Sequence, residues 1–325
     1  VKLDLSKCPD FHALPARLHH SVSIGLETAS LTWSLQRPVH SSSSVPSDIL
    51  TSISDIFDAM EHIKLRSGQH FALFVDEYDK LVVRSLHNRT VASEEYLQTN
   101  DFMAEFFTML KAQANEGTIP FQFITGSSRL PKGMWSGANA ITDLTFDPGM
   151  AEALGYTWEQ IEHYYGTQLN WLQHLHRLTR DQLREVMEQW YDRHRWSPDT
   201  DQHVFNPWSV HQLMATGKFE PHWAGSGSNT RLLNSKLLMK QLVRSLLMID
   251  STISISAKNL KDSRLPQQAG EPLSDEAQTA LLVGAGMLAI HPEYKSPVLS
   301  EPQSTDIKLT IPNEDSKQAI LDTLE

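Results

Sequence analysis

The stretch that most constrains the fold of this chain is Phe71–Val75, a run of five apolar residues followed at once by the acidic Asp76 and Glu77. A short, continuous apolar run rich in Phe and Val predicts a strand that is buried on both faces of a parallel sheet. In open α/β sheets, functional groups lie just beyond the carboxyl ends of such strands. The sequence therefore predicts an α/β fold with Asp76 and Glu77 at the functional edge of its sheet.

Two adjacent acids at this position have a specific chemical use. In a nucleotide hydrolase, one acid holds Mg²⁺ through its water shell, and a neighbouring group activates or orients the attacking water. The order of the residues favours Asp76 as the metal-binding acid and Glu77 as the catalytic base. The alternative is that both carboxylates only solvate the end of the strand or cap the next turn. So short a motif does not decide between these two interpretations.

The segments before and after this strand also have patterns that predict their secondary structure. Val1–Ser6 alternates apolar and polar residues and predicts a short strand. Apolar residues between Ile49 and Ile63 recur at helical spacing, which predicts a helix leading into the central strand. Residues 82–98 are polar and predict a loop.

A second strand follows the loop after a helix. Apolar residues on one side of Asp101–Ala114 predict a helix, and Pro120–Gly126 predicts a short apolar strand that ends in small polar residues. The order strand, helix, strand implies a parallel βαβ unit. Ile141–Phe146 is predicted to be a third strand of the same sheet.

From residue 150 onwards the pattern changes to helices. Thr157-x-x-Gln160 and Thr179-x-x-Gln182 are capping-box signals, and Asn206–Pro207 is typical of a helix start. Leu232–Met248 predicts one more helix. These patterns predict an α/β core over residues 1–150, followed by a helical lid region over residues 151–260.

The last part of the chain predicts a small appendage. After a polar linker, residues 274–282 predict a short helix, and Met287–Ile290 and Ile307–Ile311 predict two strands around a polar loop. A helix followed by a hairpin predicts a winged-helix-like end over residues 261–325.

Composition limits the function classes. The net charge of −11 argues against a general nucleic-acid surface, although a local basic patch stays open as an alternative. The single cysteine, Cys8, has no partner for an internal disulfide, which favours a reducing compartment, cytoplasmic or nuclear. No stretch reaches the roughly 18 apolar residues of a spanning helix, so no membrane partner is expected.

Several further motifs accompany the acidic strand. They are Phe74–Lys80, Phe123–Arg129, Ser136–Asn139, Asp143–Thr145, Trp190–Asp192, Phe205–Val210, Trp223 with Gly225–Ser228, and Ile311–Glu314. Their order and spacing resemble the predicted AAA-ATPase family, P-loop proteins that are often fused to a PD-(D/E)XK nuclease-like domain. The resemblance implies a parallel-sheet, P-loop-NTPase-like core of AAA type, with ATP and Mg²⁺ as cofactors.

The resemblance also implies roles for individual residues. It assigns Mg²⁺ binding to Asp76 and catalysis to Glu77. Thr125, Ser127 and Ser128 end the second strand, where the family's fold places a sensor of the γ-phosphate. Arg129 resembles the arginine that follows this sensor in related ATPases, since a guanidinium can grip phosphate oxygens in a bidentate fork. The alternative for this arginine is a surface ion pair.

The chain departs from the family in one important respect. No segment matches the Walker A pattern G-x-x-x-x-G-K-[ST], whose amides and Lys cradle the phosphates. Val1–Ser6 resembles the family's second strand. The first strand and its phosphate-binding loop are therefore expected upstream of Val1, beside the strand at residues 121–125. No Asp…Glu-x-Lys arrangement marks a nuclease domain, so nuclease activity is not predicted.

Two functions from different classes follow. The first is ATP binding and Mg²⁺-dependent hydrolysis once an upstream Walker A segment completes the core, with little activity without that segment. The alternative is a non-catalytic protein-interaction or regulatory module that keeps a degenerate ATPase fold as a scaffold. A weaker third idea is nucleic-acid binding through the winged-helix-like end.

Overall fold

The structure is a computed structural model that describes residues 1–28, 46–87, 92–129, 141–223, 252–263, 274–295 and 306–322. The chain divides into two compact units, described separately below. The first comprises Val1–Thr142 with Arg264–Pro272, and the second comprises Asp143–Ser263 with Leu273–Glu325. The expected division at residues 150 and 260 stays a prediction. The helix expected over residues 232–248 lies outside the described residues.

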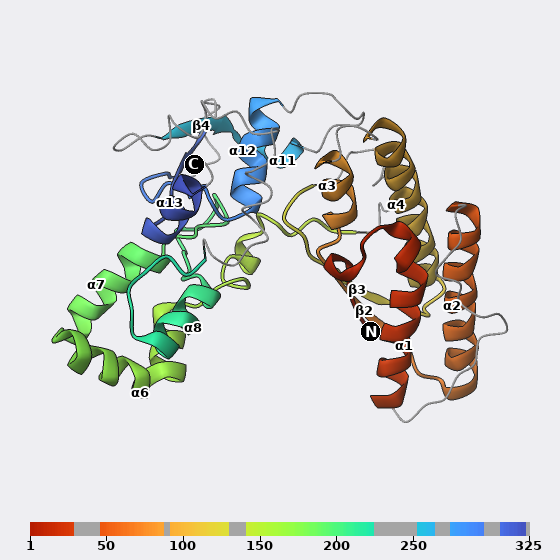
Figure 1. Ribbon diagram of the computed structural model, residues 1–325, viewed down its shortest axis with the longest axis horizontal. Coiled ribbons are helices and arrows are strands. Elements are labelled where there is room, and N and C mark those ends of the chain that lie inside the picture. The colour runs from red at the N-terminus through yellow and green to blue at the C-terminus, as the bar shows by residue number, and fades with distance from the viewer. Residues whose placement is uncertain are drawn as a thin grey trace. The chain divides into compact units, whose positions relative to one another are not determined.

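The first unit is built on a three-stranded parallel sheet in the order β1-β2-β3, of which Figure 1 labels β2 and β3. The strands are β1 (Lys2–Asp4), β2 (Ala72–Asp76) and β3 (Phe121–Ile124). Asp4 lies opposite Asp76, and Val75 lies opposite Ile124. The predicted central strand and its two predicted neighbours are thus confirmed, and the carboxyl ends of all three strands meet at one edge.

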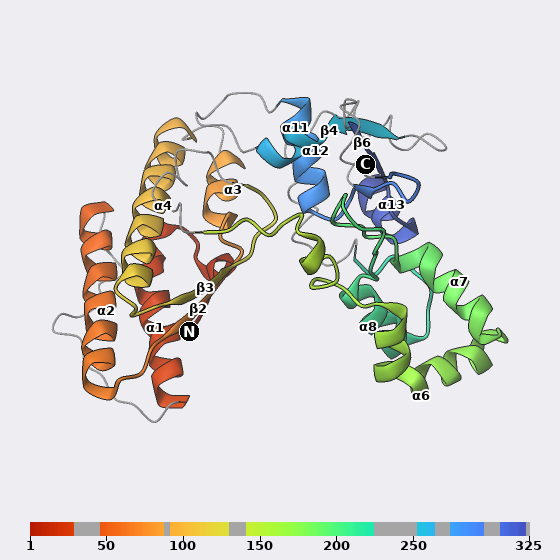
Figure 2. The same cartoon turned by 180° about the vertical axis from the view of Figure 1, so that it is seen from behind.

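Helices pack on one side of this sheet. They are α1 (Leu14–Thr28), α2 (Pro46–Ser67) and α4 (Ala92–Asn115), preceded by the 3-10 turns η1 (Leu5–Lys7) and η2 (Phe11–Ala13), with α3 (Lys80–His87) next to α4. Figures 1 and 2 both show α1, α2 and α4 on the same side of the strands. Their apolar stripes are fully buried, for example at Leu18, Ile56 and Phe106, which explains why these segments are helical.

The opposite face of the sheet is partly exposed, so the prediction of a strand buried on both faces is wrong. Leu73 and Val75 are buried, but Phe74 between them is 44% exposed, because successive side chains of a strand point to opposite faces. Phe121 on β3 is 52% exposed. The ring centroid of Phe74 lies 5.8 Å from that of Phe121 and 6.4 Å from that of Phe123. Phe74, Phe121 and Phe123 form what we call the aromatic face.

Two further predictions in this part of the chain are wrong. The loop expected over residues 82–98 contains most of α3 and the start of α4, because Val82 and Tyr96 are buried in the core. Residues 141–146 form no strand. The Asp143 carboxylate there accepts hydrogen bonds from the Thr145 amide at 3.1 Å and from the Thr145 hydroxyl at 2.6 Å. This local turn satisfies backbone groups that a strand would otherwise pair.

The second unit begins with helices whose starts were predicted correctly. After the 3-10 turn η3 (Pro148–Met150) come α6 (Trp158–His176), α7 (Arg180–Tyr191) and α8 (Pro207–Thr216). Both expected capping boxes form, since Thr157 and Thr179 each exchange hydrogen bonds with the Gln three residues on. The Asn206 side chain accepts from the first amides of α8.

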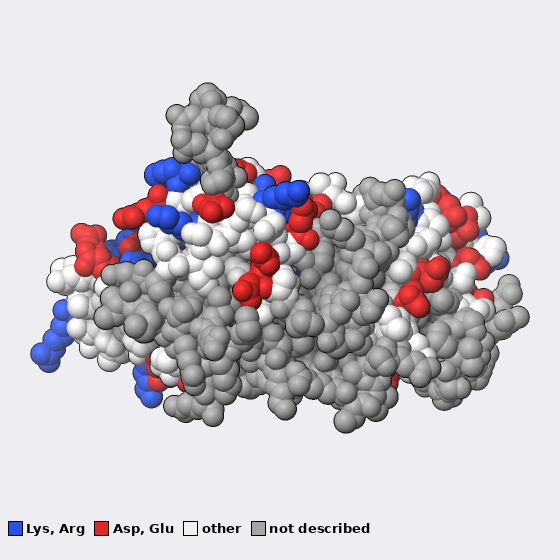
Figure 3. Space-filling model, turned by 90° about the horizontal axis from the view of Figure 1, so that it is seen from above, with Lys and Arg blue, Asp and Glu red and all other residues white. Residues whose placement is uncertain are grey.

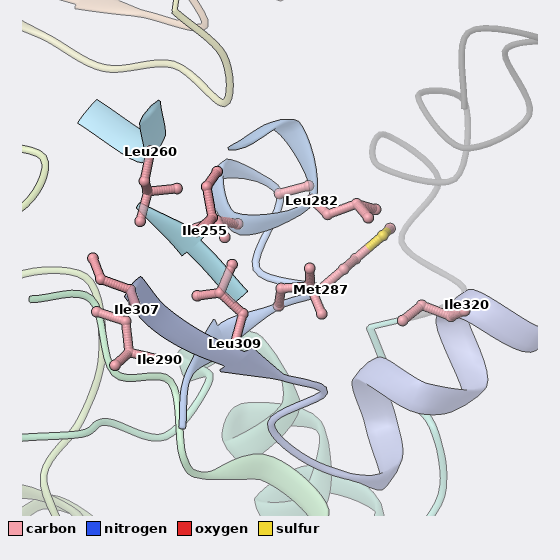
Figure 4. Packing of buried hydrophobic residues seen from close by; sticks show 11 residues of the cluster. Ile255, Leu260, Leu282, Met287, Ile290, Ile307, Leu309 and Ile320 are labelled. Carbon is pink, nitrogen blue, oxygen red and sulfur yellow. The ribbon is translucent and has the colours of Figure 1, made fainter. Parts of the chain in front are cut away.

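A three-stranded antiparallel sheet in the order β4-β6-β5 belongs to the same unit. Its elements are β4 (Ile253–Ser256), α11 (Ala257–Asp262), α12 (Asp275–Gly284), β5 (Ala289–Ile290), β6 (Asp306–Thr310) and α13 (Glu314–Leu321). The helix and two strands predicted here are confirmed, whereas β4 was not predicted. Figure 4 shows Ile255, Leu282 and Leu309 among the apolar side chains that fill the space between sheet and helices.

Buried polar contacts join the helices of this unit to its C-terminal part. Asp315, which is 2% exposed, accepts hydrogen bonds from Ser209 Oγ at 2.5 Å and from the Trp223 amide at 3.0 Å. Asn313 Nδ2 donates to the backbone oxygen of Asp192 at 2.6 Å. Because each contact spans about a hundred residues or more of sequence, α7, α8 and α13 fold as parts of one unit.

The surface carries mixed charge. On the face shown in Figure 3, the coloured Lys and Arg side chains are interspersed with those of Asp and Glu. Among the helices that the structure describes, none combines the length and the hydrophobicity that crossing a bilayer requires.

Candidate functional site

The candidate site lies at the edge where β1, β2 and β3 end. Asp76, the last residue of β2, accepts a hydrogen bond of 2.8 Å from Thr125 Oγ1, which directly follows β3. The Thr125 amide in turn donates to the Val75 oxygen at 2.8 Å. The Asp76 side chain is 46% exposed, and its Oδ2 lies 3.9 Å from Lys2 Nζ. One carboxylate oxygen is thus oriented by the neighbouring strand, while the other lies within ion-pair distance of Lys2.

Glu77 adopts a backbone conformation that is unusual for its residue type. Its φ angle is +50°, in the left-handed region that side chains with a Cβ seldom occupy. Such strained positions are concentrated at functional sites. Glu77 Oε2 is buried and lies 3.2 Å from Lys80 Nζ, close enough for an ion pair although the two groups are not aligned as a hydrogen bond. Lys80 therefore partly neutralises the residue that was predicted to be the base.

The charges at this edge are balanced in pairs. Each acid that ends or follows a strand has its own lysine, the pairs being Asp4–Lys7 at 3.4 Å, Asp76–Lys2 at 3.9 Å and Glu77–Lys80 at 3.2 Å. Burial tends to raise the pKa of Asp4, but the hydrogen bonds from Ser6 and Lys7 outweigh it and hold that pKa below its usual value. At this edge, each of the three carboxylates is therefore already partly compensated by a lysine.

Next to the two acids in the chain, a largely buried cluster of side chains joins the turn after β2 to the loop after β3. Asp79, which is 2% exposed, accepts hydrogen bonds from the Ser127 amide at 3.2 Å, from Ser127 Oγ at 3.0 Å and from Ser128 Oγ. The Tyr78 hydroxyl donates to the Ser128 oxygen at 2.6 Å. Tyr78, Asp79, Ser127 and Ser128 are called the Asp79 clasp below.

The structure thus brings together some of the predicted site residues and separates others. Asp76 and Thr125 are in direct contact at the open edge. The hydroxyls of Ser127 and Ser128 instead point to Asp79, and the half-buried Arg129 follows them in the chain. No role was predicted for Asp79 or Lys80 from the sequence. The signal that could have identified them is the acid and lysine of Asp79-Lys80, which follow Asp76 and Glu77 within three residues.

The donor groups suit a magnesium ion better than a metal held by protein alone. Among the residues that the structure describes, no group of three or more His, Cys, Asp or Glu could enclose a metal. Mg²⁺ usually keeps several waters and is bound through one or two carboxylates together with substrate phosphates. The half-exposed carboxylate of Asp76 fits that mode of binding.

The sheet order and the strand ends at this edge can be compared with those of known α/β proteins. A parallel α/β sheet with an acid at the tip of its central strand and a hydroxyl at the tip of the next strand is consistent with an AAA-like core. In agreement, residues 3–133 match the model of the family described as "Predicted AAA-ATPase". The resemblance predicted from the sequence is thereby confirmed over these residues, which include both strand ends of the site.

One curated relative is similar to part of this chain. It is described as "Uncharacterized protein in vnfD 5'region" and comes from Azotobacter chroococcum mcd 1. The two are 26% identical over 168 residues, which cover 51% of this chain and 29% of the relative. The chain thus spans less than a third of the length of that protein. No solved structure significantly matches the chain.

Proposed function

We propose that the first unit is the ATP-hydrolysing core of an AAA-ATPase-like protein, and that a phosphate-binding loop from outside these 325 residues completes it. The observation that carries the proposal is the hydrogen bond from Thr125 to Asp76 at the open edge of a parallel sheet. It orients an exposed carboxylate at the place where α/β proteins bind ligands. The match of residues 3–133 to a family of predicted ATPases supports the same function.

Each residue at the edge has a proposed role. Asp76 holds the water shell of Mg²⁺, and bound Mg²⁺ supplies positive charge to the phosphates. Glu77 orients or activates the attacking water once it leaves its ion pair with Lys80. Thr125 lies one hydrogen bond from Asp76 and can relay the state of the metal to the loop after β3. Arg129, at the end of that loop, is the proposed partner of the γ-phosphate, because a guanidinium can bind phosphate oxygens in a bidentate manner.

The open side of the sheet supports completion by a further segment. Among the described strands, β3 is an edge strand, and its residue Phe121 is 52% exposed. Exposed strand edges and contiguous apolar faces are normally covered in folded proteins. An additional strand beside β3, with a helix over the aromatic face, would cover both features. Because the sequence contains no Walker A segment, whose amides and lysine cradle the phosphates, the 325-residue chain alone should bind ATP weakly.

Titration with fluorescent ATP and Mg²⁺ tests this function. We expect weak binding by the 325-residue chain and tight binding with turnover by the natural chain extended to include a Walker A segment. In the extended chain, Glu77→Gln should retain binding and abolish turnover. Asp10→Asn, which alters an exposed cap elsewhere in the first unit, should change neither. Unchanged turnover in the Glu77→Gln variant would remove Glu77 from the role of base.

Another observation favours the alternative function, a non-catalytic interaction module. Glu77 is engaged by Lys80, and the aromatic face is available for a protein partner. If the extended chain neither binds nor hydrolyses ATP, this scaffold function is the better explanation. The same titration therefore separates the two proposals.

The end of the second unit supports a winged-helix-like arrangement, because its elements follow in the order β4, α11, α12, β5, β6 and its sheet has the order β4-β6-β5. The same elements do not support nucleic-acid binding. The helix before the β5–β6 pair, α12, begins with Asp275 and Glu276, and its middle residues are buried in the unit. A helix that begins with acidic residues and is largely buried provides few groups that could bind a phosphate backbone. We expect no mobility shift of duplex DNA at moderate salt, and a salt-sensitive shift would reverse this conclusion.

A further inference from the structure

We propose that Asp79 is the positioning residue of the nucleotide site, and that Ser127 and Ser128 act through Asp79 rather than by contacting a phosphate. The inference rests on the proposed ATP-binding role of the edge formed by Asp76 and Thr125. It changes the roles predicted from the sequence, in which the two serines sense the γ-phosphate directly.

The first argument is the number of protons that the serines can donate. A phosphate oxygen only accepts hydrogen bonds, and a serine hydroxyl has a single proton to donate. Ser127 Oγ donates that proton to Asp79 Oδ2 at 3.0 Å, and Ser128 Oγ donates to the same oxygen. To reach a phosphate, either hydroxyl would have to leave a carboxylate that is 2% exposed and cannot turn to water instead.

The second argument is the close fit between the loop after β3 and the turn after β2. The Tyr78 amide donates to the Thr125 oxygen at 3.0 Å, and the Tyr78 hydroxyl donates to the Ser128 oxygen at 2.6 Å. A Cβ on Gly126 would lie 2.4 Å from Tyr78 Cδ1 and 2.5 Å from Asp79 Oδ1, so only glycine allows this approach. The Asp79 clasp therefore holds both segments in one arrangement.

The two arguments together give Asp79 an indirect function. Asp76 lies at the start of the turn that the clasp holds, and Thr125 lies at the start of the loop. Fixing turn and loop to each other fixes the contact between these two residues and the position from which Arg129 leaves the loop. Small displacements of groups at a reaction centre reduce turnover strongly. Loss of the clasp should thus lower kcat more than it weakens nucleotide binding, which depends chiefly on the phosphate-binding loop.

Amide exchange in the 325-residue chain tests the clasp without any nucleotide. Asp79→Ala should increase the exchange rate of the Ser127 amide and of its neighbours in the loop, while Asp10→Asn should leave these rates unchanged. Should Asp79→Ala fail to fold, Ser128→Ala, which keeps the carboxylate and removes one donor, should give a smaller increase at the same amides. Wild-type exchange rates in both variants would overturn the proposal.

A double-mutant cycle in the ATP-hydrolysing extended chain tests the role in catalysis. Asp79→Asn and Ser128→Ala should each lower kcat, by roughly tenfold to a hundredfold, with little change in the Kd for Mg-ATP. The double variant should be no worse than Asp79→Asn alone, because both changes remove the same contact. Additive effects, or a Ser128→Ala variant that weakens ATP binding but not ADP binding, would show a direct phosphate contact and overturn the proposal. If the extended chain binds no ATP, the proposed function fails, whereas the exchange experiment still decides whether the clasp exists.

Discussion

Thr125 Oγ1 donates a hydrogen bond to Asp76 Oδ1 over 2.8 Å, joining residues 49 positions apart in the sequence. The contact places a hydroxyl from the end of β3 against the acid at the end of β2, which no local pattern specifies. It links Thr125 directly to the predicted magnesium-binding acid.

Thr125→Val should destabilise the first unit by about 0.5 to 1.5 kcal/mol, because it removes the hydroxyl while keeping the shape of the side chain. Thr125→Ser retains the donor and should lose less. Urea denaturation followed by circular dichroism measures both free energies of unfolding. Equal stability of the two variants would mean that the hydrogen bond contributes nothing measurable.

Glu77→Gly should be more stable than Glu77→Ala by roughly 0.5 to 1 kcal/mol, because glycine adopts a φ of +50° without steric cost. Both variants lose the ion pair with Lys80, so their difference isolates the backbone. Glycine is also more flexible than alanine in the unfolded chain, which lowers the stability of the glycine variant and limits its advantage over the alanine variant. Chemical denaturation of the two variants measures this difference. A glycine variant less stable than the alanine variant would show that the backbone at Glu77 is not strained.

Gly126→Ala should destabilise the first unit by about 1 to 3 kcal/mol, because the added methyl group would overlap Tyr78 and Asp79. Gly25→Ala is a matched control in the same unit. Gly25 lies within α1, and a Cβ there would meet Val1 Cγ2 at an ordinary 3.6 Å. This control should stabilise the unit by about 0.5 to 1 kcal/mol through its helix propensity. Thermal unfolding of both variants should therefore show shifts of opposite sign.

Two histidines of the second unit should give its stability opposite dependences on pH. The hydrogen bond to buried Asp192 raises the pKa of His203, so its contribution is full below pH 6.5 and is lost as pH rises through the folded-state pKa. Burial lowers the pKa of His194 to about 4, so its contribution is full above pH 6.5 and is lost as pH falls toward 4.

Urea midpoints measured between pH 4.5 and 8.5 test these signs. His194→Gln should flatten the loss of stability on acidification, and His203→Gln should flatten the loss at the alkaline end. A His194→Gln variant with the same acid slope as the wild type would show that this histidine is not responsible.

Local patterns were sufficient for the ends of several elements. The capping boxes at Thr157 and Thr179 and the Asn206 cap each involve residues within three positions, so the sequence alone determines where α6, α7 and α8 begin. The apolar run before Asp76 likewise determined that β2 exists and that acids follow it. These features depend on the spacing of neighbouring residues and not on the rest of the fold.

The tertiary structure alone decided which contacts those elements make. The exposure of Phe74 depends on which helices cover the sheet, and the engagement of Ser127 by Asp79 depends on the register of β2 with β3. Residues 141–146 were predicted to form a strand, but a side-chain turn at Asp143 satisfied the backbone instead. Periodicity determines which residues of one element share a face. Contacts between residues some fifty positions apart depend instead on the packing of the whole unit, and that packing brought Asp79 against Ser127.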